Sequence, residues 1–276
     1  MAPLPPDTTI SRGVRGPRTA LAPARQSRVS IVTPCLNAVG TIGDTLTTVR
    51  RQTYAVEHVI TDGLSDDGTQ ELVRALAPEA VLSSRLDSGL YDAMNRGIGL
   101  CRGEIIGILN ADDFYCHEDA VRSVVEVFDR HPGTDIVYGG IQYVSAGATE
   151  RVTRRWRPGE ASRMAWRHGW MPPHPAVFVR ASVYAELGTY RTCLSLSSDY
   201  EFMLRAMYFS GRRAVYLDDI LVTMRTGGVS NASLSNRLKA NKQDRDAWKL
   251  NDASPPLALG LMKPLRKLHQ WRWFRG

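Results

Sequence analysis

Residues 107–115 read GILNADDFY, in which an apolar strand pattern runs directly into two adjacent aspartates and then into two aromatic residues. Neighbouring carboxylates repel each other and are costly to bury unless a cation joins them. Asp is also common where a strand leads through a turn into a helix cap. This stretch by itself fits a metal site and a cap equally well.

Strand and helix patterns alternate on both sides of this stretch. Strand patterns occupy 29–33, 56–61, 80–84 and 104–110, and helical patterns occupy 41–53, 69–77 and 89–103. Such alternation predicts an α/β fold with a mostly parallel, Rossmann-like sheet flanked by helices. Ligands of such sheets bind outside the carboxyl ends of the strands. Asp62, Asp87, Asp112 and Asp113 follow strands, so we expect them together on one edge, here called the carboxylate rim.

The second half of the chain is less regular. A helix is expected near 117–130, strands at 135–140, 175–179 and 214–219, and helices from 197 and from 234. The segment 145–174, rich in Trp, Arg, Gly and Pro, is expected to be a crossing loop region with one short helix. This half predicts a small region of mixed strands and helices beside the mainly parallel part of the sheet.

Composition bounds the class of protein. The chain has 276 residues, 43% of them hydrophobic, and a net charge of +7 that lies mostly at its two ends. Its four cysteines form no C-x-x-C pair, so a reducing cytoplasm fits best. No run approaches the roughly 18 apolar residues of a membrane span. Residues 1–27, rich in Pro, Arg and Gly, are expected to be a disordered leader.

Several carboxylates on one rim favour a divalent cation. Oxygen ligands suit a hard ion, Mg²⁺ or Mn²⁺, and such ions usually keep water and hold substrate phosphates. The expected substrate therefore carries a diphosphate. In the loop after 56–61, Gly63 allows a ligand to approach Asp62 closely.

Five blocks carry a family resemblance: VSIVTPCLN, VITDGLSDDGT, LDSGLYDAMNRGI, GEIIGILNADDFY and SSDYEF. In this order and spacing they resemble family 2 glycosyltransferases of the GT-A fold, in particular the bacterial colanic-acid and polysaccharide-biosynthesis type. The resemblance covers about residues 28–230. It implies an enzyme of hexosyltransferase type that moves a sugar from a nucleotide-diphosphate sugar to a glycan or lipid-linked acceptor, with inversion at the anomeric carbon.

The resemblance also implies roles for single residues. Asp62 would accept from the nucleobase, Asp113 would bind the metal and Asp112 the ribose, with the reverse assignment of these two open. Asn110 stands where many relatives have Asp, and Met94 where many have Arg, so Arg96 is expected to substitute from the next turn. The other expected nucleotide-sugar contacts are Thr33, Pro34, Asn37, Gly63, Asp87, Asn95, Arg96 and Asn110.

The catalytic base is expected to be Asp199 in the block SSDYEF. Inverting transfer needs a carboxylate away from the metal that takes the proton of the acceptor hydroxyl. The same text also predicts a capping box from Ser198 to Glu201, in which Asp199 merely favours the helix dipole. Because capping would occupy Glu201, that residue is the weaker candidate for the base.

Two further features are candidates for acceptor or diphosphate binding. His174 lies between prolines just before a strand, although a single His is more often structural. Gly227 and Gly228 form a late loop whose amides could approach anionic oxygen, and a plain turn explains them equally well.

The basic tail completes the predicted organisation. Residues 255–276 combine leucines at helical spacing with Lys, Arg and terminal aromatics, which is typical of a helix in a membrane interface or of one packed on its own domain. We expect a leader (1–27), a GT-A domain (28–233, divided into 28–115 and 116–233) and a helical tail (234–276). The predicted location is cytoplasmic, at the inner face of the cell membrane.

Three other classes remain as alternatives. A nucleotidyltransferase would also use aspartates and Mg²⁺, but TPCLNAVG lacks its Gly-rich basic loop. A dinucleotide oxidoreductase is disfavoured because GIGLCRG (97–103) ends a helix instead of following a strand. A non-enzymatic protein that binds anionic membranes would explain the ends but not the carboxylate rim. Nucleic acid is not an expected partner.

Overall fold

The computed structural model describes residues 27–145, 147–226, 234–257 and 259. The first half contains β1 (Val29–Cys35), α1 (Ile42–Arg50), β2 (Val56–Asp62), α2 (Thr69–Leu76), β3 (Val81–Ser84), α3 (Leu90–Leu100), β4 (Ile105–Ile108) and β5 (Phe114–Tyr115). The second half contains α4 (Ala120–Arg130), β6 (Ile136–Ser145), β7 (Ala148–Trp156), α5 (Arg163–Arg167), η1 (His174–Ala176), β8 (Val177–Arg180), α6 (Ala181–Leu187), α7 (Ser198–Met203), η2 (Leu204–Phe209), β9 (Ala214–Arg225) and α8 (Leu234–Lys249).

One sheet organises both halves, with strand order β3-β2-β1-β4-β8-β6-β9-β5 and β7 paired to β6. Strands β3, β2, β1 and β4 are parallel, and β8 is antiparallel to β4 and β6. Strand β9 runs parallel to β6 and pairs with β5, which directly follows the NADD sequence. The expected α/β fold with a mostly parallel sheet is confirmed, and the last long strand returns to the loop that carries Asp112 and Asp113.

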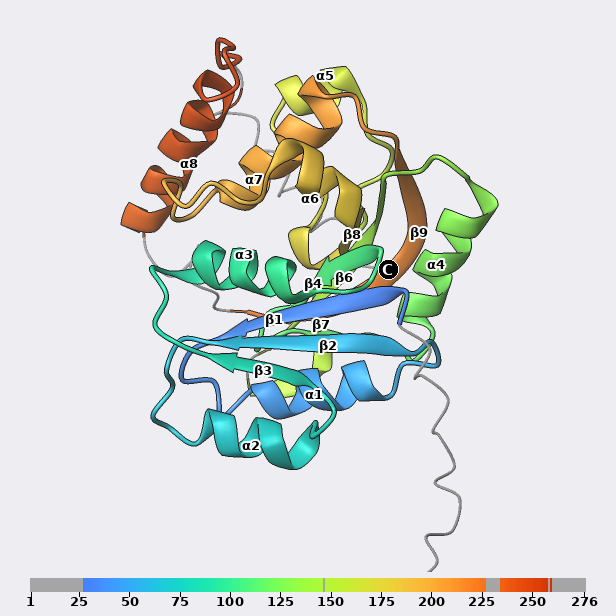
Figure 1. Ribbon diagram of the computed structural model, residues 1–276. Coiled ribbons are helices and arrows are strands. Elements are labelled where there is room, and N and C mark those ends of the chain that lie inside the picture. The colour runs from blue at the N-terminus through green and yellow to red at the C-terminus, as the bar shows by residue number, and fades with distance from the viewer. Residues whose placement is uncertain (1–26, 146, 227–233, 258, 260–276) are drawn as a thin grey trace, which may run out of the picture.

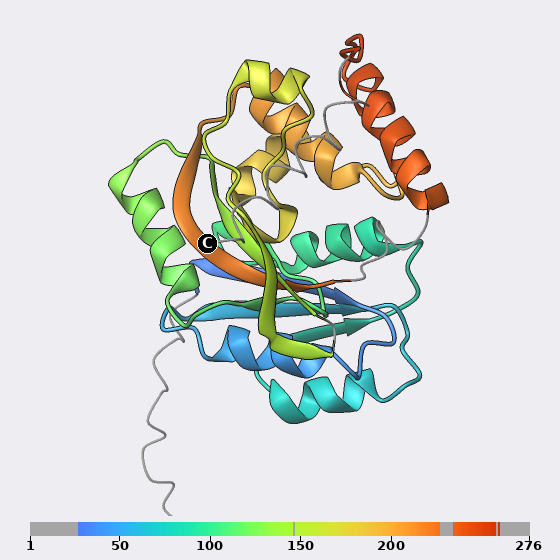
Figure 2. The same ribbon diagram turned by 180° about the vertical axis from the view of Figure 1, so that it is seen from behind.

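Helices cover both faces of the sheet (Figures 1 and 2). On one face α3 packs with α5, α6 and α7 over a large core that contains Val32, Met94 and Trp248. On the other face α4 covers the β1, β4, β6 and β9 region, and α1 and α2 cover the β1 and β2 region. Met94, where a relative's arginine was expected, is 1% exposed in the first core, where a charged side chain would be costly.

Helix α3 lies very close to β1. A Cβ atom added at Gly97 would lie 2.3 Å from Cγ1 of Val32, so only glycine permits this approach. The near-match GIGLCRG therefore has a packing role at the end of a helix, as its position in the sequence indicates.

Two elements in the second half were not predicted. The region expected to be a crossing loop contains β7, which pairs with β6 through Ile141–Trp156 and Tyr143–Arg154. Its arginine-rich sequence hides the strand pattern because much of β7 stays half-buried or exposed at the side of the sheet. Helix α6 directly follows β8 and was also missed.

The predicted capping box of α7 is wrong. Ser197, and not Ser198, is the N-cap residue, and it makes no side-chain cap hydrogen bond. Glu201 is fully buried, and its carboxylate pairs with Arg205 through Nε–Oε1 and Nη2–Oε2 contacts of 3.0 Å. A charged guanidinium stabilises a buried carboxylate more than a neutral backbone amide at the helix start would.

Some predictions fall outside the described residues. These are the leader up to residue 26, Gly227 and Gly228, and nearly all of the basic tail. The polar helix expected from residue 234 is confirmed as α8. Among the described residues, none of the helices has the length and apolarity that a membrane crossing requires.

Candidate active site

Asp62 ends β2 and is fully buried. Its carboxylate accepts hydrogen bonds from the amide of Leu64 at 3.1 Å and from the hydroxyl of Ser84 at 2.6 Å, and both the amide and the hydroxyl of Ser65 also donate to it. Burial alone would raise the pKa of Asp62, but these hydrogen bonds outweigh it and hold the pKa below its usual value. Asp62 is therefore an ionised anchor for its own loop, and its predicted contact with a nucleobase stays a prediction.

The loops after β1 and β2 are joined by Asn37. The backbone amide of Asn37 donates to Ser65 Oγ at 2.8 Å, and its side-chain Oδ1 accepts from the backbone amide of Asp66 at 3.1 Å. Asn37 has a positive φ of 49°, a conformation that Asn tolerates better than most residues. Thr33, in the preceding strand, meets Nε2 of the buried His58 at 2.9 Å, and Pro34 lies in the same strand opposite Thr61.

Asp87 lies beside Gly63. A Cβ atom at Gly63 would come within 2.8 Å of Oδ2 of Asp87, so a side chain there would displace this carboxylate. Arg96 on α3 links the two loops, because it donates to the carbonyl of Asp62 at 2.9 Å and lies 3.9 Å from Oδ2 of Asp87. The structure therefore brings together Asp62, Gly63, Asp87 and Arg96 at the carboxyl ends of β2 and β3.

The NADD loop forms a second group. Asn110 Nδ2 donates to Oδ2 of Asp113 at 3.0 Å, while Oδ1 of Asp113 and Oδ1 of Asn110 are buried with no hydrogen-bond partner in the described part of the chain. Burial raises the pKa of Asp113 well above its usual value, and the charge of Asp112 adds to this. The hydrogen bond from Asn110 and the charge of Arg225 oppose the shift. The loop therefore holds two unsatisfied oxygen atoms and a carboxylate with too little nearby positive charge.

Arg225, at the end of β9, holds this loop and was missed in the sequence. Its Nη1 donates to the carbonyl of Asp112 at 2.6 Å, and its Nη2 pairs with Asp44 of α1. Its guanidinium also lies over the ring of Phe114, 5.1 Å from the centroid. Its place directly before the predicted Gly-Gly loop was the only local signal in the sequence.

The donor set of the NADD loop fits a hard divalent cation. Asp113 and Asn110 each offer a buried oxygen atom that lacks a partner, and half-buried Asp112 is next to them. No cluster of three His, Cys, Asp or Glu side chains suited to a metal occurs in the part of the chain that the structure describes. Substrate oxygens and water would have to complete the coordination, as they usually do for Mg²⁺.

Asp199 belongs to a third group, together with Tyr91, His174 and Tyr190. It is half-buried near the start of α7, and its Oδ1 accepts a 2.8 Å hydrogen bond from the hydroxyl of Tyr91 on α3. His174 is buried, and its Nε2 lies 2.9 Å from the hydroxyl of Tyr190. Burial lowers the pKa of His174, although the charge of Asp199 opposes this, so the imidazole is neutral near pH 7.

Asn95 contacts this third group and not the first two. Its amide forms two hydrogen bonds with the backbone of Tyr190, one donated at 2.8 Å and one accepted at 2.9 Å. Both polar atoms of the side chain thus have protein partners. Tyr91 and Tyr190 were missed, although Tyr91 lies inside the quoted block LDSGLYDAMNRGI and could have been noticed there.

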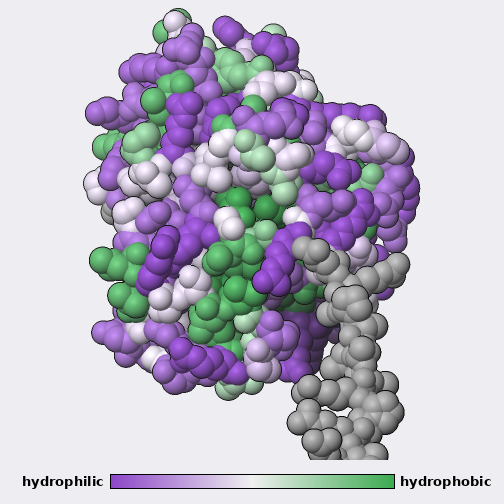
Figure 3. Space-filling model, in the orientation of Figure 1, coloured by the Kyte–Doolittle hydropathy of each residue, from purple (hydrophilic) through white to green (hydrophobic). Residues whose placement is uncertain are grey.

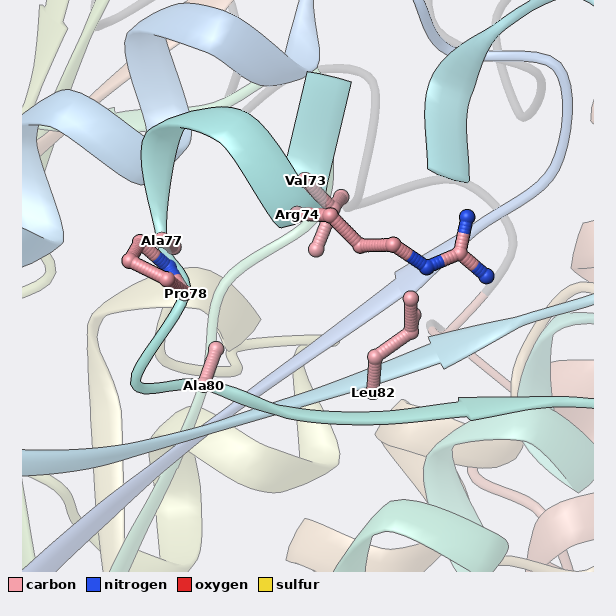
Figure 4. Close-up of a pocket in the computed structure, with 6 residues that line it drawn as sticks. All are labelled: Val73, Arg74, Ala77, Pro78, Ala80 and Leu82. Carbon is pink, nitrogen blue, oxygen red and sulfur yellow. The ribbon is translucent and has the colours of Figure 1, made fainter. Parts of the chain in front are cut away.

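A shallow hollow lies elsewhere on the molecule. Six residues line it around the end of α2 and the edge strand β3: Val73, Arg74, Ala77, Pro78, Ala80 and Leu82 (Figure 4). The face in Figure 3 is largely hydrophilic, with an apolar area over strands β1–β3. The hollow has no acidic lining residue and is not the candidate site.

Comparisons with known proteins agree with this arrangement. The model of glycosyl transferase family 2 matches residues 30–186. A PGL/p-HBAD biosynthesis glycosyltransferase of Mycobacterium tuberculosis is 28% identical over 209 residues, which cover 73% of this chain and 78% of the relative.

Solved structures share the fold. Staphylococcus aureus TarS 1-349 in complex with UDP has a TM-score of 0.61 and 16% identity, over 80% of this chain and 65% of that chain, so this chain spans a little under two thirds of it. The mannosyltransferase PcManGT of Pyrobaculum calidifontis, in complex with GDP-Man and Mn²⁺, has a TM-score of 0.61 and 19% identity, over 88% of this chain and 71% of that chain. The chain belongs to glycosyl transferase family 2 and is an enzyme of the glycosyltransferase type.

Proposed function

We propose that the protein transfers a sugar from a nucleotide-diphosphate sugar to a hydroxyl group of a glycan or lipid-linked acceptor. The observation that carries this proposal is the buried Asp113 carboxylate, whose Oδ1 has no partner within the described residues of a family 2 fold. Fold neighbours that contain UDP, or GDP-Man with Mn²⁺, support the class of donor.

Each of the three groups receives a role. The loops after β1, β2 and β3, with Asn37, Asp62 and Asp87, would hold the nucleoside. Asp113 and Asn110 would hold Mn²⁺ or Mg²⁺, with Asp112 at the ribose or at the metal. The cation would neutralise the negative charge of the diphosphate as it departs.

Asp199 would be the base of an inverting displacement. Its carboxylate takes the proton from the acceptor hydroxyl while the acceptor oxygen forms a bond to the anomeric carbon. The bond from that carbon to the diphosphate oxygen breaks, and its electron pair leaves with the diphosphate. Glu201 does not compete for this role because its carboxylate is fully buried and paired with Arg205.

The finer assignments are part of the proposal. The five ordered blocks support a polysaccharide-biosynthesis acceptor, of which the colanic-acid type is one form. The division into a donor half (28–115), an acceptor half (116–233) and a tail (234–276) is one of these assignments. The tail from residue 255 would hold the enzyme at the cytoplasmic face of a membrane, with His174, Gly227 and Gly228 near the acceptor or diphosphate.

A thermal-shift experiment tests the donor and the metal together. The melting temperature is measured with UDP, GDP, ADP and their sugar conjugates, each with MnCl₂ and again with EDTA. Ligands that bind the folded state raise the apparent stability by mass action. We expect one base to give a shift that EDTA removes. The absence of any nucleotide-dependent shift with Mn²⁺ would contradict the proposal.

A further inference from the structure

Helix α3 contacts both the donor side and the acceptor side of the proposed site. Tyr91, in its first turn, is 7% exposed and donates its hydroxyl hydrogen to Oδ1 of Asp199 at 2.8 Å. These two residues are 108 positions apart in the sequence. The described part of the chain shows no hydrogen bond to the second oxygen, Oδ2, and in the proposed reaction this is the oxygen that takes the proton of the acceptor.

One turn later on the same helix, Asn95 fixes the neighbouring segment. It exchanges two hydrogen bonds with the backbone of Tyr190, at 2.8 Å and 2.9 Å. The ring of Tyr190 lies 5.7 Å from that of Tyr91, and its hydroxyl meets His174. Residues four apart on a helix share one face, so Tyr91 and Asn95 act on the acceptor side together.

The next residue of α3 points to the donor side. Arg96 donates to the backbone carbonyls of Arg85 at 2.8 Å and Asp62 at 2.9 Å. Gly97 lets the helix lie directly on Val32 of β1, which leaves little room for the helix to slide. The position of α3 is therefore fixed relative to the loops that carry Asp62 and Asp87.

We infer that Tyr91 is a positioning residue for the reaction. Its hydroxyl holds the Asp199 carboxylate at a fixed position on α3, and Arg96 joins the same helix to the donor-side loops. This inference rests on the proposed function, in which Asp199 is the base. A carboxylate with one oxygen fixed presents the other in a defined direction, and small displacements of a base lower the rate steeply. Burial, together with the charge of Asp199, raises the pKa of Tyr91 well above its usual value, so the phenol stays a donor at any working pH.

The test compares three variants in one assay. Release of nucleoside diphosphate is measured from UDP-glucose, UDP-N-acetylglucosamine and GDP-mannose with MnCl₂, with water as the acceptor of the sugar, and the donor that the unmodified protein cleaves fastest is used for kinetics. Tyr91→Phe removes only the hydroxyl. Asp199→Asn removes the proposed base. Tyr138→Phe is the matched control, because its buried hydroxyl donates to the carbonyl of Gly159 at 3.1 Å and accepts from the amide of Ala161 at 2.9 Å, away from Asp199.

We expect Tyr91→Phe to lower kcat by about 10- to 100-fold, with KM for the donor nearly unchanged and the melting temperature lowered no more than in Tyr138→Phe. Tyr138→Phe should lower the melting temperature and leave kcat within about twofold. If Asp199→Asn is inactive but Tyr91→Phe keeps the original kcat, the positioning role is refuted. A large loss of both stability and donor binding in Tyr91→Phe would also refute the positioning role, because it would show that the hydroxyl has only a structural effect.

Full turnover by Asp199→Asn has a different meaning. It would overturn the assignment of Asp199 as the base, on which the role of Tyr91 depends. Failure of the proposed function itself would show as no cleavage of any of the three donors by the unmodified protein. These failures are thus distinguished by which protein, variant or unmodified, turns over the donor.

Discussion

Asn110 donates a 3.0 Å hydrogen bond to Oδ2 of Asp113, while Oδ1 of Asp113 is buried without a partner in the described part of the chain. One neutral amide donor cannot balance a buried carboxylate, and the adjacent Asp112 makes the balance worse. The loop is therefore less stable alone than it would be with a cation, which leads to the first prediction.

Asp113→Asn should stabilise the protein in EDTA and abolish the effect of Mn²⁺. The variant removes a buried charge and keeps the size of the side chain, so the melting temperature in EDTA should rise by about 2–4 °C. The shift that Mn²⁺ adds in the presence of nucleotide should disappear. Asp246→Asn, at a surface pair with Lys249, is the control and should keep that shift. A Mn²⁺-dependent shift in Asp113→Asn equal to that of the unmodified protein would contradict the metal assignment.

Arg225→Gln should weaken binding of Mn²⁺. The substitution removes the hydrogen bond to the Asp112 carbonyl and the pair with Asp44, so the NADD loop loses its side-chain connection to β9 and keeps only the backbone pairing of β5 with that strand. We expect an affinity about tenfold lower in an EPR titration with nucleoside diphosphate present. Arg130→Gln, which loses an exposed pair with Glu126 on α4, should bind Mn²⁺ normally. Equal affinities in both variants would show that Arg225 does not hold the loop.

Glu201→Ala should destabilise the fold without removing the base. Its carboxylate contacts Arg205 at 3.0 Å and Asn251 at 3.1 Å, and its loss leaves the buried guanidinium without a carboxylate to balance its charge. Urea unfolding should give a loss of about 3–5 kcal/mol in the free energy of unfolding. Glu126→Ala, at an exposed pair, should cost less than about 1 kcal/mol. If Glu201→Ala stays fully stable but loses all turnover, Glu201 is a better candidate for the base than Asp199.

The buried His58 should make the fold less stable in mild acid. Burial lowers its pKa from 6.5 to about 4, so the folded state keeps it neutral where the unfolded chain already binds a proton. Its contribution is therefore complete above pH 6.5 and is lost as the pH falls toward 4. His58→Gln should flatten the fall in unfolding free energy between about pH 6.5 and pH 5, and the exposed His131→Gln should not. Equal slopes for the two variants would refute this account.

Much of the fold could be predicted from the sequence. The β-branched runs of β1, β2 and β4 have one plausible environment, a buried parallel sheet, and the carboxyl ends of such strands meet. The aspartates at the ends of β2 and β4 could thus be assigned to one rim. Strand β7 could not be predicted, because its arginines suit a strand only when β6 pairs with it.

The hydrogen-bond partners of the candidate residues could not be predicted from the neighbouring sequence. Tyr91 and Asp199 are far apart in the sequence, as are Arg225 and Asp112. The sequence pattern from Ser198 to Glu201 predicted a capping box, but Glu201 pairs instead with the buried Arg205, four residues later. Which partner a carboxylate takes depends on how deeply both groups are buried, and that burial depends on the whole fold.

The role of Asp199 as the base for transfer from a nucleotide sugar is the central claim, and donor turnover by Asp199→Asn tests it most directly. The measurement is the release of nucleoside diphosphate with MnCl₂, beside donor binding followed by calorimetry. We expect Asp199→Asn to bind donor as the unmodified protein does and to turn it over at least about 100-fold more slowly. Turnover at the unmodified rate, with donor binding unchanged, would contradict the claim.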